Sequence, residues 1–197
     1  MTRILTLWGK TDELSNETHP LLYHMLDAGY VSSALWNDAL PAQLKRDMAG
    51  SLGLAVEPTG RLIAFWSSLH DLGKAGPAFQ IKHLPSQTIL VREGFPFPQK
   101  AFFTPKPHGL VTSWALANEN LLPGLDAEQS EMVGRVLGGH HGLWPDGDTF
   151  EDVGRTANLG GPIWQEARKE LVEILSSVFA PPDEFQFPTE DQDRNIF

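Results

Sequence analysis

The stretch RLIAFWSSLHDLGKAG, residues 61–76, decides the fold because an apolar helical pattern ends there in a histidine and an aspartate. Apolar side chains cover most of the circumference of the predicted helix, at Leu62, Ile63, Phe65, Trp66 and Leu69. A helix that is apolar on nearly all sides belongs at the centre of a domain. We therefore expect a central helix from about Thr59 to Gly73, with His70 and Asp71 at its end.

The rest of the chain also shows helical spacing, and strand patterns are scarce. Apolar residues recur at helical intervals in residues 19–36, 41–52, 108–120, 126–138 and 162–179. Six prolines from Ala75 to Pro107 predict a long irregular loop after the central helix. A second loop is expected between residues 143 and 161. The sequence thus predicts an all-α helical bundle, formed as one domain over residues 1–197.

Composition narrows the chemistry of any bound ion. The chain has no cysteine, so disulfides and thiolate metal sites are excluded, and a metal would be held by His, Asp or Glu. No apolar run approaches the roughly 20 residues of a membrane span. The N-terminus MTRILTLWGK lacks the apolar core and cleavage site of a secretory signal. We expect a soluble, cytoplasmic protein.

The charge is uneven along the chain. The formal net charge is −10, which argues against broad, non-specific binding to nucleic acid. The segment from Leu72 to Leu110 is nevertheless basic: its only anion is Glu93, and its cations are Lys74, Lys82, Arg92, Lys100 and Lys106. Charge alone favours a solvated loop for this segment over a phosphate-binding one.

Most of the histidines, together with one aspartate, occur where metal ligands could converge. The candidate ligands are His24, His70, Asp71, His108, His140 and His141. Asp71 can bridge two ions because a carboxylate has two oxygens, whereas an imidazole has one free nitrogen. The stretch GGHHGLW, residues 138–144, places two histidines between glycines. We expect these glycines to release the backbone so that both rings turn towards one ion.

Each candidate ligand alone has an ordinary structural explanation, as a hydrogen-bonded core residue or a helix cap. His19 and His83 keep that interpretation. Imidazoles and a carboxylate without thiolate favour two divalent transition-metal ions, manganese, iron, nickel or cobalt, over magnesium or zinc. Two such ions would activate a water and stabilise an in-line phosphoryl displacement. The predicted reaction is phosphoester hydrolysis.

The order of these motifs resembles a known family. YHMLDAGYVSSALW, LHDLGKAGPAFQ, PHG and GGHHG follow one another, and the opening LWGK fits as well, so that the likeness runs from about residue 7 to residue 144. The chain resembles the HD nuclease domain of the CRISPR-associated helicase-nuclease of type I systems. That resemblance implies an all-α HD-domain bundle that holds two metal ions. It also implies cleavage of single-stranded DNA, which a fused or separate helicase delivers after an RNA-guided surveillance complex has opened the target.

The resemblance also implies residue roles. His24, His70 and Asp71 would hold one ion, and Asp71 would bridge to a second ion on His108, His140 and His141. Lys74 would lie near the attacking water or the scissile phosphate. The basic segment would contact the phosphates of the strand, through Lys82, Arg92, Lys100 and Lys106. Asp71 and Lys74 are thus the expected catalytic residues.

The sequence departs from the family in two ways. The family closes its first metal site with an aspartate on a later helix, and no matching segment occurs here. Family domains also continue past this length, so we expect a chain cut short at its C-terminus, without the helicase part and with an impaired first metal site.

Two other functions fit the motifs. An HD-type phosphodiesterase acting on nucleotides or cyclic dinucleotides shares HDLGK and a later pair of histidines. In its cyclic-dinucleotide branch Glu follows that pair and Gly-Tyr-Pro comes soon after, whereas Gly142 follows it here and no Gly-Tyr-Pro occurs. The other alternative is a catalytically silent module that binds metal or docks onto a partner.

Overall fold

The computed structural model describes residues 3–12, 14–15, 17–99, 103–142, 144, 147–155 and 157–187. The longer helices are α1 (Leu21–Ala34), α2 (Ala42–Ser51), α3 (Val56–Ser68), α6 (His108–Asn118), α7 (Ala127–Gly138) and α9 (Pro162–Phe179). Three shorter ones are α4 (Pro77–Gln80), α5 (Leu84–Arg92) and α8 (Gly147–Arg155). The predicted all-α fold is confirmed. None of the helices described is long and apolar enough to cross a membrane.

Short elements connect these helices. A π-turn, η2 (Leu35–Ala39), extends α1, and 3-10 turns form η1 (Arg3–Thr6), η3 (Leu72–Lys74) and η5 (Gly139–His141). The strands β1 (Trp8–Thr11) and β2 (Thr18–Pro20) pair antiparallel in a small hairpin just before α1. The turns η3 and η5 matter most for function, because the candidate ligands lie in or beside them.

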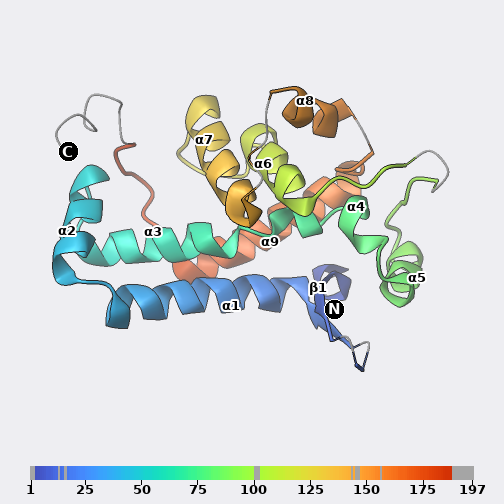
Figure 1. The fold of residues 1–197 in the computed structure, drawn as a ribbon, viewed down its shortest axis with the longest axis horizontal. Helices are drawn as coiled ribbons and strands as arrows, with labels where there is room; N and C mark the ends of the chain where they lie inside the picture. Colours follow the sequence, from blue (N-terminus) through green and yellow to red (C-terminus); the bar gives the residue numbers. More distant parts are fainter. Residues whose placement is uncertain are drawn as a thin grey trace.

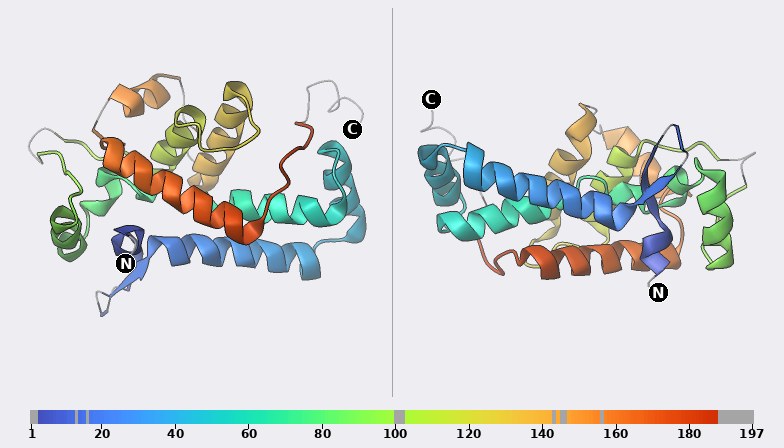
Figure 2. Two further views of the ribbon diagram at one scale, coloured as in Figure 1. Left: turned by 180° about the vertical axis from the view of Figure 1, so that it is seen from behind. Right: turned by 90° about the horizontal axis from the view of Figure 1, so that it is seen from below.

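The long helices form two layers. Helix α1 runs along α3, and α9 lies behind both (Figures 1 and 2). Helices α6 and α7 pack against each other above the end of α3, and α8 covers α6. The core includes Met25 of α1, Phe65 of α3 and Leu171 of α9 from one layer and Val111 of α6 from the other, all buried. The apolar central helix therefore delivers residues 70–74 to the junction of both layers.

Helix boundaries follow the predictions with local exceptions. Helix α3 begins at Val56 rather than Thr59 and ends at Ser68 rather than Gly73. His70 and Asp71 consequently lie in a turn, where neighbouring side chains can converge more readily than on a helix. Two short strands occur where none was expected.

The long irregular loop predicted after the central helix is only partly irregular, because it contains α4 and α5. Pro77 and Pro85 lie in the first turns of these helices, where a missing N–H costs nothing. Residues 93–99 and 103–107 are non-helical, as predicted. The second predicted loop contains the helix α8.

A buried ion pair ties α9 to the rest of the bundle. Arg168 donates from Nε to Oε2 of Glu119 at 2.7 Å and from a terminal nitrogen to Oε1 at 2.5 Å. Its other terminal nitrogen donates to the carbonyls of Ala75 and Leu159, at 2.7 and 3.0 Å. Glu119 ends α6, and Ala75 follows η3. Arg168 therefore connects three segments that surround the turn containing Asp71.

Candidate metal centre

Asp71 lies in the turn after α3, and its side chain is almost fully buried. The turn abuts the first residues of α6. The Gly73 N–H donates to Oγ1 of Thr112 at 2.8 Å, and that hydroxyl donates to the His70 carbonyl at 3.1 Å. A Cβ at Gly73 would lie 2.1 Å from the His108 carbonyl oxygen. Only glycine at this position lets the HD turn and the start of α6 meet.

A second close approach places His108 beside the paired histidines. A Cβ at Gly109 would lie 2.3 Å from the Gly138 carbonyl oxygen, so α6 and α7 cross with their backbones nearly in contact. Helix α7 leads directly into η5, which contains His140 and His141. Gly142 then ends this turn with a positive φ of 75°.

Contrary to the expectation from the sequence, the glycines around the paired histidines do not all release the backbone. Only Gly142 supplies an unusual backbone conformation, whereas Gly138 is needed for the close approach of α7 to α6.

Four imidazoles surround the two oxygens of Asp71. Oδ2 lies 2.7 Å from Nε2 of His24 and 3.1 Å from Nε2 of His70. Oδ1 lies 2.9 Å from Nε2 of His108 and 3.4 Å from Nε2 of His140. The sixth predicted ligand, His141, lies against the ring of His108.

His141 and His108 face each other, with their Nε2 atoms 3.1 Å apart. Two groups result in which all potential ligand atoms lie within 4.8 Å of one another. The first group is His24, His70 and Asp71, and the second group is Asp71, His108, His140 and His141. The structure thus brings all six predicted ligands together around the one carboxylate.

Several features of this arrangement fit divalent cations. Oδ1 of Asp71 is buried and lacks a hydrogen bond of good geometry, although His108 and His140 lie within ion-pair distance. The facing nitrogens of His108 and His141 can share at most one proton when both rings are neutral, and an ion would satisfy both. Imidazoles with one carboxylate are ligands that manganese, iron, cobalt and nickel accept. Among the described residues no second carboxylate joins either group.

The surroundings also shift the pKa values of the ligands. Burial would raise the pKa of Asp71, but the four imidazoles around its oxygens, His108 foremost, outweigh burial and hold that pKa far below the ordinary value. The nearby Asp71 carboxylate raises the pKa of His140 above its usual 6.5, whereas desolvation, with the nearby imidazoles, lowers the pKa of His141. The surroundings of Asp71 therefore favour its ionised form.

The raised pKa of His140 predicts how ion affinity depends on pH. In the metal-free protein this proton stabilises the fold below pH 6.5, and the stabilisation is lost as the pH rises through the folded pKa. An ion must displace that proton, so Mn²⁺ affinity should rise as the pH increases above 6.5 and through the folded pKa of His140. Calorimetry in buffers of different ionisation enthalpy would count the released protons. His19→Gln is a control, since His19 pairs with Asp27 outside both groups. Affinity that falls with rising pH would contradict this assignment.

Gly73 gives a test of the geometry itself. Gly73→Ala places a methyl group against backbone atoms of α6, which cannot move aside as a side chain could. We expect a loss of about 2–4 kcal/mol in unfolding free energy and weaker binding of an ion by the second group. Gly50→Ala is the matched control, because none of the described residues has an atom within 4 Å of a Cβ there. Thermal unfolding and Mn²⁺ titration measure both effects, and an unchanged Gly73→Ala protein would refute the close contact.

The remaining predicted residues lie around the centre or outside the described part. Lys74 donates to Oδ2 of Asp71 at 2.8 Å. Lys82 lies over the ring of Phe79, Lys106 pairs with Asp152 on α8, and Arg92 ends α5. Lys100 is outside the described residues.

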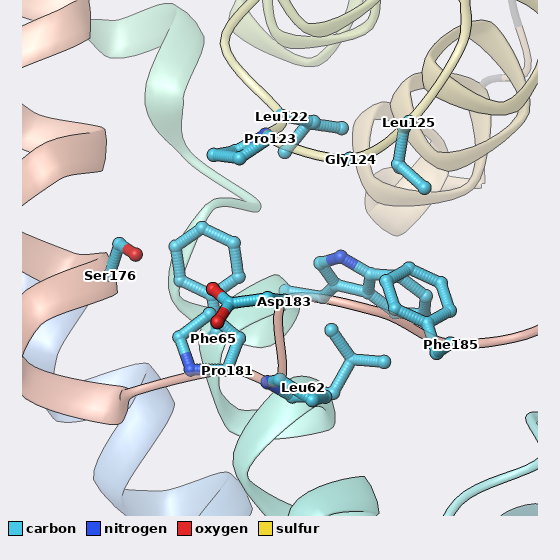
Figure 3. Close-up of a pocket in the computed structure, with 12 residues that line it drawn as sticks. Leu62, Phe65, Leu122, Pro123, Gly124, Leu125, Ser176, Pro181, Asp183 and Phe185 are labelled. Carbon is cyan, nitrogen blue, oxygen red and sulfur yellow. The ribbon is translucent and has the colours of Figure 1, made fainter.

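His19 and His83 lie outside both groups. His83 caps α5, where its Nδ1 accepts a hydrogen bond from the Ser86 N–H. A separate pocket between α3, residues 122–125 and residues 181–185 contains none of the candidate ligands (Figure 3). The metal centre is thus confined to the HD turn, α1 and the ends of α6 and α7.

Sequence reasoning missed residues that build the site without being ligands. Thr112 links the HD turn to α6, and Gln80 links it to β1. The FQ that follows HDLGK was a signal for Gln80, but its contacts depend on the fold. No motif in the neighbouring sequence indicates that Thr112 has this role.

The match to known proteins covers nearly all of the chain. The family model described as Cas3, HD domain, matches residues 8–195. The CRISPR-associated endonuclease/helicase Cas3 of Thermus thermophilus is 32% identical over 169 residues, which are 86% of this chain and 18% of that protein. The chain therefore spans under a fifth of the length of this curated relative.

Two solved structures share the fold. The Thermus thermophilus Cas3 HD domain determined in the presence of Ni²⁺ is 28% identical, with a TM-score of 0.68 over 93% of this chain and 68% of that one. A chain of a CRISPR RNA-guided surveillance complex in a pre-nicking state is 26% identical, with a TM-score of 0.72 over 93% of this chain and 22% of that one. With a family model that matches nearly its whole length and a six-residue cluster centred on the HD turn, the chain belongs to the Cas3 HD-domain family.

Proposed function

We propose that this chain is a metal-dependent nuclease that hydrolyses phosphodiester bonds in single-stranded DNA, as part of type I CRISPR antiviral defence. The observation that supports it most is the single buried carboxylate whose two oxygens are shared by two groups of imidazoles. The Cas3 relatives, named as endonuclease/helicase or nuclease/helicase, support the same reaction.

Asp71, Lys74 and the imidazoles would each have a separate role in such a reaction. Two divalent ions, when bound, would activate a water and neutralise charge on the phosphate. Asp71 would hold both ions, because its oxygens face different groups. Lys74 keeps an ammonium at the edge of the first group, 2.8 Å from Asp71, where it can contact a phosphate oxygen. The imidazoles would hold the ions as neutral ligands, and the centre would then keep positive charge for a phosphodiester.

The basic segment offers phosphate contacts beside the centre. The ammonium groups of Lys74 and Lys82 lie 5.0 and 5.1 Å from the centre of the Phe79 ring, which is 5.6 Å from the ring of His108. Burial, with the charge of Lys74, lowers the pKa of Lys82. A phosphate between these cations would offset their repulsion. We assign the neighbouring phosphate of the strand to Lys82, and further contacts to Arg92, Lys100 and Lys106.

Lys82→Ala tests this assignment. We expect about a 3- to 10-fold weaker affinity for single-stranded DNA and a smaller salt dependence, because one phosphate contact is removed. Lys45→Ala is the control, since Lys45 donates to the Asn37 carbonyl and belongs to α2, which lies at the opposite end of the molecule from α4 (Figure 1). Fluorescence anisotropy with a labelled oligothymidine, in Ca²⁺ to prevent cleavage, measures both variants. Equal affinities would remove Lys82 from the binding surface.

The cofactors we propose are two divalent transition-metal ions, manganese, iron, nickel or cobalt. The structure of a relative with Ni²⁺ supports divalent metal binding by this family. The partners we propose are a fused or separate helicase and the RNA-guided surveillance complex. They follow from the relatives, which contain the helicase or were solved within such a complex.

The test is degradation of circular single-stranded DNA by the purified chain with Mn²⁺ or Ni²⁺, compared with the same reaction in EDTA. Metal-dependent loss of the circle would establish endonucleolytic cleavage. Tight Mn²⁺ binding without cleavage of any strand would instead support a silent metal-binding module. Hydrolysis of a cyclic dinucleotide with intact DNA would support the nucleotide phosphodiesterase.

A further inference from the structure

Gln80 is a buried, hydrogen-bonded residue near the metal centre that is not one of the candidate ligands. Its side chain is fully buried. Oε1 accepts from the Trp8 N–H at 3.2 Å, and Nε2 donates to the carbonyls of Trp8 and Lys74, at 2.8 and 2.9 Å. The Trp8 indole also donates to the Gln80 carbonyl at 3.4 Å. One carboxamide therefore joins strand β1 to the residue three positions after Asp71.

Strand β1 in turn touches the first group on two sides. The Lys74 ammonium donates to the Gly9 carbonyl at 2.8 Å and to Oδ2 of Asp71 at 2.8 Å. A Cβ at Gly9 would lie 3.0 Å from Cβ of His24, so the strand lies directly against α1 at this ligand. The Gly9 carbonyl thus contacts the Lys74 ammonium and holds it beside the Asp71 carboxylate.

We propose that Gln80 is a positioning residue that acts through Lys74. By fixing β1, Gln80 sets the Gly9 carbonyl opposite Asp71 and keeps the ammonium at the edge of the first group. A carboxamide suits this task because it offers an acceptor and two donors in one plane. This inference rests on the metal-binding part of the proposed function.

The proposal has an unusual consequence for metal affinity. An ion in the first group would share Oδ2 of Asp71 with a nearby ammonium, and the two positive charges repel. Releasing Lys74 should therefore strengthen ion binding. Ordinary structural damage from losing a buried amide would weaken it. The sign of the change separates positioning from a merely structural role.

The experiment is calorimetric titration of the full chain with Mn²⁺ in four proteins: the wild type, Gln80→Met, Lys74→Met and the double variant. His24→Ala identifies the heat that belongs to the first group. We expect Lys74→Met to raise the affinity of that ion about tenfold. Gln80→Met should raise it about threefold alone and leave it unchanged when Lys74 is already Met.

Controls and contrary outcomes are distinct. Gln87→Met is the matched control, because Oε1 of Gln87 has no hydrogen-bond partner, and it should leave the affinity unchanged. If Gln80→Met does not fold, Gln80→Asn keeps the amide but is too short to reach the same partners. Lower or unchanged affinity in Gln80→Met, or an equal change in both backgrounds, would overturn the proposal. So would Mn²⁺ binding that does not depend on His24. If the four affinities follow the expected pattern but the wild type cleaves no DNA, the nuclease proposal is refuted and the role of Gln80 is not.

Discussion

Replacing Asp71 by alanine is expected to lower the rate of DNA cleavage at least ~1000-fold and to weaken the binding of both ions. The reason is that Asp71 is the only carboxylate in either group, and each group uses a different one of its oxygens. Removing it leaves neutral imidazoles, which hold a dication less tightly, and leaves the Lys74 ammonium without its anionic partner. Cleavage of circular single-stranded DNA and Mn²⁺ titration measure the two losses.

The controls for Asp71→Ala separate chemistry from folding. His83→Ala should retain cleavage and ion binding, because His83 caps α5 and belongs to neither group of candidate ligands. Asp71→Asn keeps the shape of the side chain and should lose most of the activity while the helical content stays unchanged. Ion binding by Asp71→Ala that matches the wild type would show that the imidazoles suffice. A defect in His83→Ala as large as that in Asp71→Ala would overturn the ligand assignment.

Replacing Arg168 by methionine should produce the largest loss of stability, about 3–5 kcal/mol of unfolding free energy. The side chains of Arg168 and Glu119 are 1% and 6% exposed, so the variant leaves a buried carboxylate without its partner. It also frees the carbonyls of Ala75 and Leu159. Chemical denaturation in EDTA measures the loss without a contribution from bound ions.

Neighbouring positions provide the controls for Arg168→Met. Lys169→Met, one residue along α9, removes an exposed partner of Glu173 and should change stability by less than about 1 kcal/mol. Adding Glu119→Gln to Arg168→Met should recover part of the loss, because the buried charge is then gone. If Arg168→Met is as stable as Lys169→Met, the ion pair does not hold the bundle together.

Much of the fold was readable from the sequence because helix patterns are local. The all-round apolar residues 61–69 form the central helix, and those in residues 19–36 form α1. The predicted start at Pro162 also holds, since proline favours the first turn of a helix, whereas Pro41 lies one residue before α2 as its N-cap. Proline spacing was a poorer guide in the segment before α6. There Pro85 opens the helix α5 rather than excluding it.

The candidate ligands were likewise visible as residue types and motif order, but their convergence was not. His24 and Asp71 are 47 residues apart, and their 2.7 Å contact exists only because α1 packs along α3. His108 reaches Asp71 because Gly73 lets α6 approach, and the paired histidines reach His108 because Gly138 lets α7 approach.

The sequence by itself determined the long helices, the residue types of the candidate ligands and the family. The tertiary structure alone decided that one carboxylate lies between two groups of imidazoles and that Gln80 and Arg168 surround it. The physical reason is the distance along the chain over which each kind of interaction acts. Helix propensity acts over a few residues, whereas close backbone contacts and buried hydrogen bonds join segments that are far apart along the chain.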